Sequence, residues 1–169
     1  MSQTVDEHRD SSPQHLCCAV VTVSDTRTLE TDRGGALLLD LLSAAGHEVA
    51  DRVLVADEPD QIRSLLEQYQ GRDELDAILI TGGTGIGRRD QTCETVSALL
   101  TKPLPGYGEL FRMLSYAEIG PAAMLSRAVG GLLDRKLVLT MPGSPAAVQL
   151  AMEKLILPEL PHLVHEARK

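Results

Sequence analysis

Short strand-like segments that alternate with helical patterns constrain the fold of this chain more than any other feature. The strand-like segments cover 19–23, 49–55, 77–80 and 136–140. The first, third and last are almost continuous apolar runs, which is typical of strands buried on both faces of a parallel sheet. Because the segments between them repeat apolar residues at helical spacing, the sequence predicts an α/β fold with a mostly parallel sheet and helices on both of its faces.

The length of 169 residues fits one hydrophobic core. We therefore expect a single three-layer domain over residues 16–169, preceded by a disordered polar tail over residues 1–15. The segment 102–108 holds two prolines and two glycines, so we expect a loop there. Two prolines near the C-terminus, Pro158 and Pro161, are expected to break the closing helix.

The carboxyl ends of the predicted strands locate a candidate binding site. Four loops fall at those ends, beginning at Ser24, Asp57, Gly82 and Pro142, and all are rich in Asp, Ser, Thr or Gly. Ligands of open parallel sheets bind beyond the carboxyl ends of the strands. The four loops are therefore expected to converge on one site.

Composition argues against several classes of partner. A net charge of −8, with one Phe, three Tyr and no Trp, provides neither the basic surface nor the stacking side chains of a nucleic-acid-binding protein. The three cysteines have no C-x-x-C spacing, so neither a disulfide framework nor a zinc site is indicated. No uncharged apolar stretch approaches the roughly 20 residues that span a bilayer, and the N-terminus lacks the apolar run of a secretory signal. We expect a cytoplasmic protein that binds neither nucleic acid nor membrane.

The glycine-rich loop 82–87 does not match two familiar phosphate-binding motifs. A dinucleotide fingerprint fails because Arg88 or Asp90 stands where the third glycine belongs. A Walker A loop fails because Arg88 replaces the lysine and Arg89 the hydroxyl residue. The remaining hypothesis is that the glycines let backbone N–H groups approach an anion at a helix N-terminus, with the two arginines adding positive charge. The alternative is a tight turn that needs glycines for a positive φ.

Three further features have both a structural and a functional interpretation. Asp90 and Asp57 each precede a predicted helix, so each is either an N-cap or a magnesium ligand that bridges phosphates. The segment 142–145 (PGSP) is either only a helix start, with Ser144 as the N-cap and Pro145 at the first helical position, or part of the site. The sequence leaves these alternatives open.

Taken together, five motifs resemble the MoaB/Mog family of molybdenum cofactor biosynthesis proteins over about residues 19–165. They are TVSD at 22–25, TGGTG at 81–85 with RDQT at 89–92, PGYGE at 105–109, SRA at 126–128 and MPGSP at 141–145. The resemblance implies a molybdopterin-binding α/β fold that assembles into homotrimers or homohexamers. It also implies transfer of AMP from Mg-ATP to the terminal phosphate of molybdopterin, with release of pyrophosphate.

The resemblance also assigns roles to individual residues. It implies that Asp57 and Asp90 are catalytic and hold Mg²⁺. The implied substrate-binding residues are Ser24, Asp25, Gly82, Gly83, Thr84, Gly85, Thr92, Glu109, Ser126, Arg127, Pro142, Gly143, Ser144 and Pro145. Two alternatives remain, a non-catalytic molybdopterin-binding or assembly protein of the same family and a generic nucleotide-binding regulator.

Overall fold

One six-stranded sheet, in the order β2-β1-β3-β6-β5-β4, forms the centre of the computed structural model, which describes residues 13–169. Strands β2, β1, β3 and β6 are parallel, and β5 and β4 extend the sheet in antiparallel pairs. The strands are β1 (Cys17–Val23), β2 (Glu48–Val55), β3 (Ala77–Thr81), β4 (Lys102–Pro103), β5 (Gly130–Leu133) and β6 (Lys136–Met141). The predicted single α/β domain with a mostly parallel sheet is confirmed, whereas residues 1–12 of the predicted tail lie outside the described residues.

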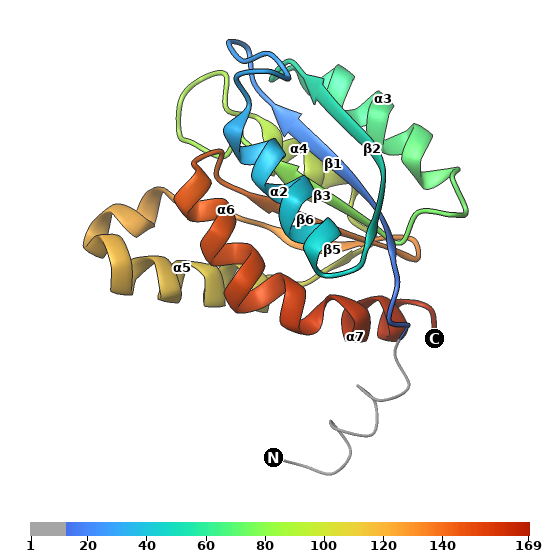
Figure 1. The fold of residues 1–169 in the computed structure, drawn as a ribbon. Helices are drawn as coiled ribbons and strands as arrows, with labels where there is room; N and C mark the ends of the chain where they lie inside the picture. Colours follow the sequence, from blue (N-terminus) through green and yellow to red (C-terminus); the bar gives the residue numbers. More distant parts are fainter. Residues whose placement is uncertain (1–12) are drawn as a thin grey trace.

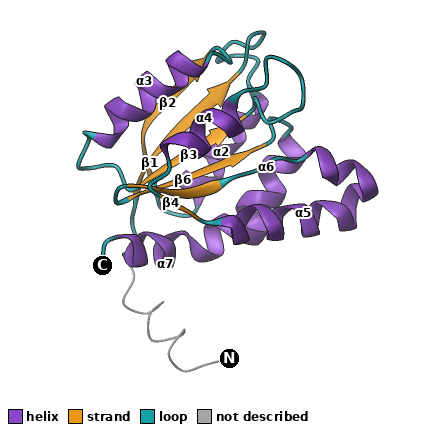
Figure 2. Cartoon of the chain, turned by 180° about the vertical axis from the view of Figure 1, so that it is seen from behind, coloured by secondary structure: helices purple, strands orange, loops and turns teal. Residues whose placement is uncertain are grey.

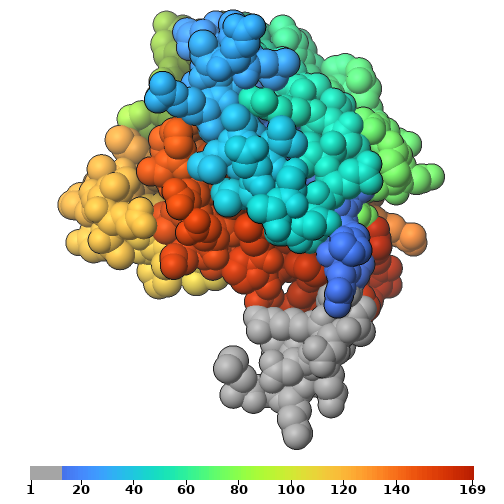
Figure 3. Space-filling view, viewed as in Figure 1, coloured from blue at the N-terminus to red at the C-terminus, as the bar shows by residue number. Residues whose placement is uncertain are grey.

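Helices cover both faces of this sheet, which makes the predicted three layers (Figures 1 and 2). One face carries α2 (Arg33–Ala44), α5 (Pro105–Ile119), α6 (Pro145–Ala151) and α7 (Leu157–Ala167). The other face carries α3 (Pro59–Gln70) and α4 (Thr92–Leu99). In Figure 3, α2 and the α6–α7 region lie side by side, and α5 with the 3₁₀ helix η1 (Gly120–Leu125) forms the left edge of the molecule.

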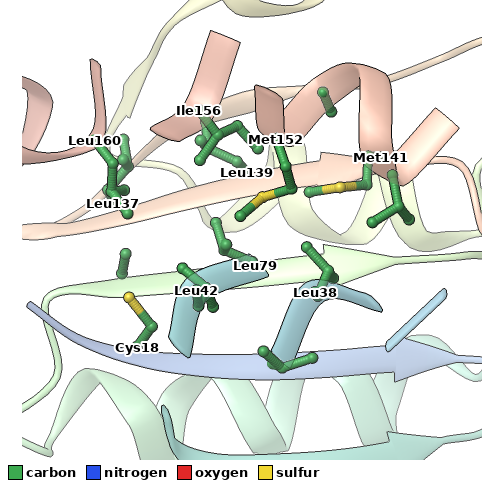
Figure 4. Packing of buried hydrophobic residues seen from close by; sticks show 14 of the residues in the cluster. Cys18, Leu38, Leu42, Leu79, Leu137, Leu139, Met141, Met152, Ile156 and Leu160 are labelled. Atoms are coloured by element: carbon green, nitrogen blue, oxygen red, sulfur yellow. The ribbon is translucent and has the colours of Figure 1, made fainter. Parts of the chain in front are cut away.

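Two hydrophobic clusters fill the space between the layers. Successive strand residues point to opposite faces, so Val20 and Leu79 enter one cluster while Val21 and Ile80 enter the other. In the first cluster, Figure 4 shows side chains of α2 and β3 facing those of β6 and the C-terminal helical region. This burial on both faces explains why the strands have nearly continuous apolar sequences.

Two predictions about prolines are wrong. The segment 102–108 is not a loop, because Lys102–Pro103 forms β4 and Pro105 lies in the first turn of α5, where the missing N–H of proline costs no hydrogen bond. The closing helix is not broken either. A π-helical segment, Met152–Ile156, joins α6 to α7, Pro158 lies in the first turn of α7, and Pro161 lies within that helix.

The predicted start of the closing helix is confirmed. Ser144 caps α6, since its Oγ accepts a hydrogen bond from the N–H of Ala147 at 3.2 Å, and Pro145 occupies the first turn. Gly46 follows the last residues of α2 with a φ of +83°, the conformation that favours glycine after a helix. Within residues 13–169, no helix is both long and apolar enough to cross a bilayer.

Candidate functional site

A cleft of about 660 Å³ lies at the carboxyl end of the parallel strands. Its lining includes all four loop starts that the sequence singled out, Ser24, Asp57, Gly82 and Pro142. In Figure 1 these loops lie at the end toward which the arrowheads of β1 and β2 point. The volume falls in the range of small-molecule sites, so the predicted convergence yields a cleft of suitable size.

The glycines of the loop serve the turn and also make room for acidic side chains. Gly82 and Gly83 have φ of +96° and +60°, which supports the turn interpretation. A Cβ on Gly83 would lie 2.5 Å from Oδ2 of Asp57, and a Cβ on Gly85 would lie 2.7 Å from Oδ2 of Asp90. Each glycine therefore allows a carboxylate to lie against the backbone of the loop.

Neither Asp57 nor Asp90 is the N-cap of the helix that follows it, so that interpretation is wrong for both. The N-caps of α3 and α4 are Glu58 and Gln91, and neither makes a side-chain capping bond. Oδ1 of Asp57 instead accepts the N–H of Gln91 at 3.0 Å, and Oδ2 of Asp90 accepts the N–H of Gly87 at 2.8 Å. Both carboxylates thus hold the glycine loop and its junction with α4.

The electrostatic environment of Asp57 is unusual for a carboxylate. It is 6% exposed, and burial raises its pKa, with the charges of Asp90 and Asp25 acting in the same direction. The hydrogen bond from the N–H of Gln91 and the charge of Arg89 oppose that rise. Perturbed carboxyl groups in a cleft are typical of functional sites.

The arginines of the glycine loop do not supply the free positive charge that the sequence suggested. Arg89 donates to Oδ2 of Asp25 and to Oε1 of Glu58, each at 2.7 Å. Its hydrogen bond lowers the pKa of Asp25. Arg88 is exposed and is not among the residues that line the cleft. We call Arg89, Asp25 and Glu58 the Arg89 group. Because it joins one arginine to two carboxylates, this group has a net negative charge.

Asp57 and Asp90 provide a donor set that suits magnesium. Both line the cleft, and carboxylate oxygens are the hard ligands that Mg²⁺ prefers. Within the described part of the chain, no group of three or more His, Cys, Asp or Glu side chains could hold a metal. Magnesium is usually bound by one or two carboxylates together with substrate phosphates. The residues therefore fit an ion that enters with a phosphorylated ligand.

Most of the residues proposed for substrate binding meet in the cleft. Those that line it are Ser24, Asp25, Gly82, Gly83, Thr84, Gly85, Ser126, Pro142, Gly143 and Ser144. Four others do not line it. Thr92 is buried behind Gly83, and its hydroxyl has no partner within residues 13–169; Pro145 is exposed at the start of α6.

The other two, Glu109 and Arg127, lie elsewhere. Glu109 is on α5, beside a separate hollow of about 240 Å³. Arg127 supports the glycine loop from outside the cleft, because its guanidinium donates to the carbonyls of Thr84 and Asp90 at 3.1 Å each and pairs with Glu94. The structure thus gives Arg127 a supporting position and separates Glu109 from the site.

Sequence reasoning missed two parts of the cleft. Arg27 lines it three residues after Ser24, so its position within the same loop was the available signal. An apolar wall formed by Ile119, Leu125 and Leu150 comes from α5, η1 and α6. These residues have no motif in common, and only the fold brings them together.

Residues 19–162 match the family model described as a probable molybdopterin binding domain. The chain belongs to this family. The chain is 51% identical over 167 residues to molybdenum cofactor biosynthesis protein B of Bacillus cereus, covering 98% of this chain and 99% of the relative. A crystal structure of a molybdenum cofactor biosynthesis protein B matches it with a TM-score of 0.89 at 52% identity, over 94% of this chain and 99% of that one.

A more distant relative has the same fold. The tungsten cofactor synthesizing protein MoaB from Pyrococcus furiosus matches this chain with a TM-score of 0.81 at 34% identity, over 94% of this chain and 100% of the other. The predicted resemblance to the MoaB/Mog family and the predicted fold are both confirmed by these matches.

Proposed function

We propose that this protein acts in molybdenum cofactor biosynthesis by transferring AMP from Mg-ATP to the terminal phosphate of molybdopterin. The observation that carries the proposal is the pairing of two carboxylates, Asp57 and Asp90, with a glycine-rich backbone in one cleft. Membership of a molybdopterin-binding family supports the pterin substrate, and the relatives' names support the pathway.

The reaction requires little acid–base chemistry from the protein. An oxygen of the pterin phosphate attacks the α-phosphorus of ATP, and the bond from that phosphorus to the bridging oxygen breaks. Pyrophosphate leaves with the electron pair. The attacking phosphate is already anionic at neutral pH, so positioning and charge neutralisation suffice, and the cleft lining contains no histidine within the described residues.

The residues of the cleft divide this work among themselves. Asp57 and Asp90 would hold Mg²⁺, which supplies positive charge to the nucleotide phosphates when it is bound. The backbone N–H groups of residues 83–85 would bind phosphate oxygens, whereas the N–H of Gly82 already donates to the carbonyl of Met141 at 3.0 Å. The apolar wall of Ile119, Leu125 and Leu150 offers a surface for a ring system.

A non-catalytic molybdopterin-binding or assembly role is the second candidate. One observation favours it: each of the two carboxylates already accepts a backbone N–H and so contributes to the shape of the loop. In that case Asp57 and Asp90 would be structural, and the cleft would bind the pterin without catalysing adenylyl transfer.

The deciding experiment is incubation with molybdopterin, ATP and magnesium, followed by measurement of adenylylated molybdopterin and pyrophosphate. We expect the wild type to form both products and Asp90→Asn to lower turnover at least about 100-fold, the loss typical of a removed transition-state contact. Asp60→Asn, on an exposed side chain of α3, is the matched control.

Three other outcomes would change the conclusion. Molybdopterin binding without product formation would support the non-catalytic role. Tight ATP or GTP binding without molybdopterin binding would support a nucleotide-binding regulator. A lower melting temperature of Asp90→Asn with unchanged turnover would make Asp90 purely structural.

The oligomeric state is proposed on the resemblance alone, as a homotrimer or homohexamer. Exposed apolar side chains on α5 that do not line the cleft, including Leu110, Met113 and Tyr116, suit such assembly. Light scattering coupled to size exclusion would measure the state, and a monomer at micromolar concentration would contradict the proposal.

A further inference from the structure

Charge is unevenly distributed among the side chains that line the cleft. The acidic residues are Asp25, Asp57, Asp90 and Glu118, and the arginines are Arg27 and Arg89. Arg89 is already paired with Asp25 and Glu58. Among the lining residues, Arg27 would therefore give an anionic ligand the largest electrostatic stabilisation.

The position of the Arg27 guanidinium is fixed, but its donors are not all used. Nη1 donates to the carbonyl of Gly143 at 3.0 Å and lies 3.8 Å from Oδ1 of Asp32. The backbone N–H of Arg27 donates to Oγ of Ser24 at 3.2 Å, which holds the loop. Nε and Nη2 have no hydrogen-bond partner within the described residues 13–169, and the side chain is 36% exposed. Two donor nitrogens thus remain for a ligand.

The carboxylate beside Arg27 does not neutralise it. The Asp32 side chain is fully buried and accepts hydrogen bonds from Oγ1 of Thr22 at 2.7 Å and from the N–H of Gly35 at 2.9 Å. It also pairs with Nη2 of Arg52 at 3.2 Å. One negative charge is shared between two arginines, so the group of Arg27, Asp32 and Arg52 has a net charge of +1. The Arg89 group, in contrast, has one positive and two negative charges.

The Arg27 guanidinium also lies beside the glycine loop. A Cβ built on Gly143 would be 3.4 Å from the Cα of Gly82 and 3.7 Å from Nη1 of Arg27. A phosphate bound by the backbone of the loop would therefore lie near the Arg27 guanidinium. The planar guanidinium suits this ligand, because its N–H groups match two phosphate oxygens at once.

We propose that Arg27 binds the terminal phosphate monoester of molybdopterin, with Asp32 and Arg52 as positioning residues. This inference rests on the proposed function. The pterin phosphate suits Arg27 because of its charge. A nucleotide triphosphate binds together with magnesium, whereas a phosphate monoester dianion without a metal needs a cation from the protein. Arg27 would thus distinguish phosphorylated from dephosphorylated pterin.

The test compares the dissociation constants of molybdopterin, dephosphorylated molybdopterin and Mg-ATP by anaerobic titration calorimetry. We expect Arg27→Ala to weaken molybdopterin binding about 10- to 100-fold, the loss typical of a hydrogen bond between charged groups. Binding of the dephosphorylated pterin and of Mg-ATP should change less than about threefold. Arg27→Lys keeps the positive charge but loses the planar guanidinium that can bind two phosphate oxygens, so it should retain part of the affinity for molybdopterin.

Two further variants sharpen the test. Arg88→Ala is the matched control, because Arg88 is an exposed arginine of the glycine loop that does not line the cleft. It should leave all three constants unchanged. Arg52→Met removes one positive charge from the group of Arg27, Asp32 and Arg52, and Arg52 does not line the cleft. This variant should therefore weaken the binding of molybdopterin a few-fold and leave the other two dissociation constants unchanged. Thermal melts establish that each variant is folded.

The possible failures are distinguishable. If the wild type binds molybdopterin and Arg27→Ala binds it equally well, the inference is overturned while the proposed function stands. Equally weakened binding of both pterins would mean that Arg27 only shapes the cleft. Weakened binding of Mg-ATP alone would mean that Arg27 contacts the nucleotide. Both results overturn the inference. A wild type that binds no molybdopterin overturns the proposed function together with the inference.

Discussion

Two buried aspartates at opposite ends of the sheet differ in how completely their oxygens are bonded. Asp76 precedes β3 at the amino end and Asp57 follows β2 at the carboxyl end, and each is 6% exposed. Asp76 accepts the N–H of Cys17 with Oδ2 and pairs with Arg168 through Oδ1. Asp57 accepts the N–H of Gln91 with Oδ1, and its Oδ2 has no hydrogen-bond partner within the described residues.

The difference separates a structural carboxylate from one that is available to a ligand. Asp76 joins the start of β1 to the C-terminal residues, so both of its oxygens stabilise the fold. The free oxygen of Asp57 lies against Gly83 in the cleft, where burial makes its charge costly unless a cation is near. We therefore expect loss of Asp57 to affect activity and loss of Asp76 to affect stability.

The largest expected effect is on turnover. Asp57→Asn keeps an acceptor oxygen for the N–H of Gln91 but removes the charge that would hold Mg²⁺. We expect adenylyl transfer to fall at least about 100-fold, as measured by single-turnover formation of adenylylated molybdopterin. Asp73→Asn, on an exposed residue, should be fully active. Unchanged turnover in Asp57→Asn would remove Asp57 from the site.

The next largest effect is a loss of stability when a side chain fills the space beside Oδ2 of Asp57. In Gly83→Ala the added methyl would lie 2.1 Å from Oγ1 of Thr92 and 2.5 Å from Oδ2 of Asp57, at a φ of +60°. We expect a loss of about 2–4 kcal/mol in the free energy of unfolding, measured by urea titration. Gly106→Ala is the control, since among residues 13–169 its added methyl meets no atom within 4 Å apart from its chain neighbours and the nearby backbone of α5. A Gly83→Ala protein as stable as the wild type would show that the loop can move away from Asp57.

A smaller effect on stability is expected at the amino end of the sheet. Asp76→Asn removes the charge that pairs with Arg168 and weakens the bond to the N–H of Cys17. Because Arg168 is half exposed, the pair is partly screened, and we expect a loss of about 1–2 kcal/mol. Molybdopterin binding should not change. Reduced binding in the folded variant would mean that the two ends of the sheet are coupled.

The smallest effect is the contribution of Asp57 to the pH dependence of stability. Burial raises its pKa, so the folded protein holds this proton more tightly than the unfolded chain does. The contribution is fully present below about pH 4, the ordinary pKa of an aspartate, and is lost as the pH rises through the higher pKa in the fold. Thermal melts at several pH values should show that Asp57→Asn lacks this loss. An identical pH profile in both proteins would contradict the raised pKa.

The fold and the position of the cleft could be predicted from local features of the sequence. The continuous apolar run of β3, AILI at 77–80, indicates a strand buried on both faces, and the parallel arrangement then brings the carboxyl ends of β1, β2, β3 and β6 to one edge. Ser24, Asp57, Gly82 and Pro142 meet there because each follows one of those strands. The segment 102–108 was misjudged because its prolines lie where a strand at the sheet edge and the first turn of a helix both tolerate them.

Which charges stay free was decided only by the tertiary structure. Arg89 is adjacent to Asp90 in sequence, yet it pairs with Asp25 and Glu58 from two other loops. Arg27, in contrast, shares its carboxylate with Arg52 and keeps two donors for a ligand. The sequence alone determined the sheet, its edge and the glycine loop, because apolar periodicity and turn chemistry act over a few residues. The charge of each part of the cleft also depends on distant side chains, such as Arg52 with Asp32 at 20 positions and Arg89 with Asp25 at 64, and only the folded chain brings them within hydrogen-bond distance.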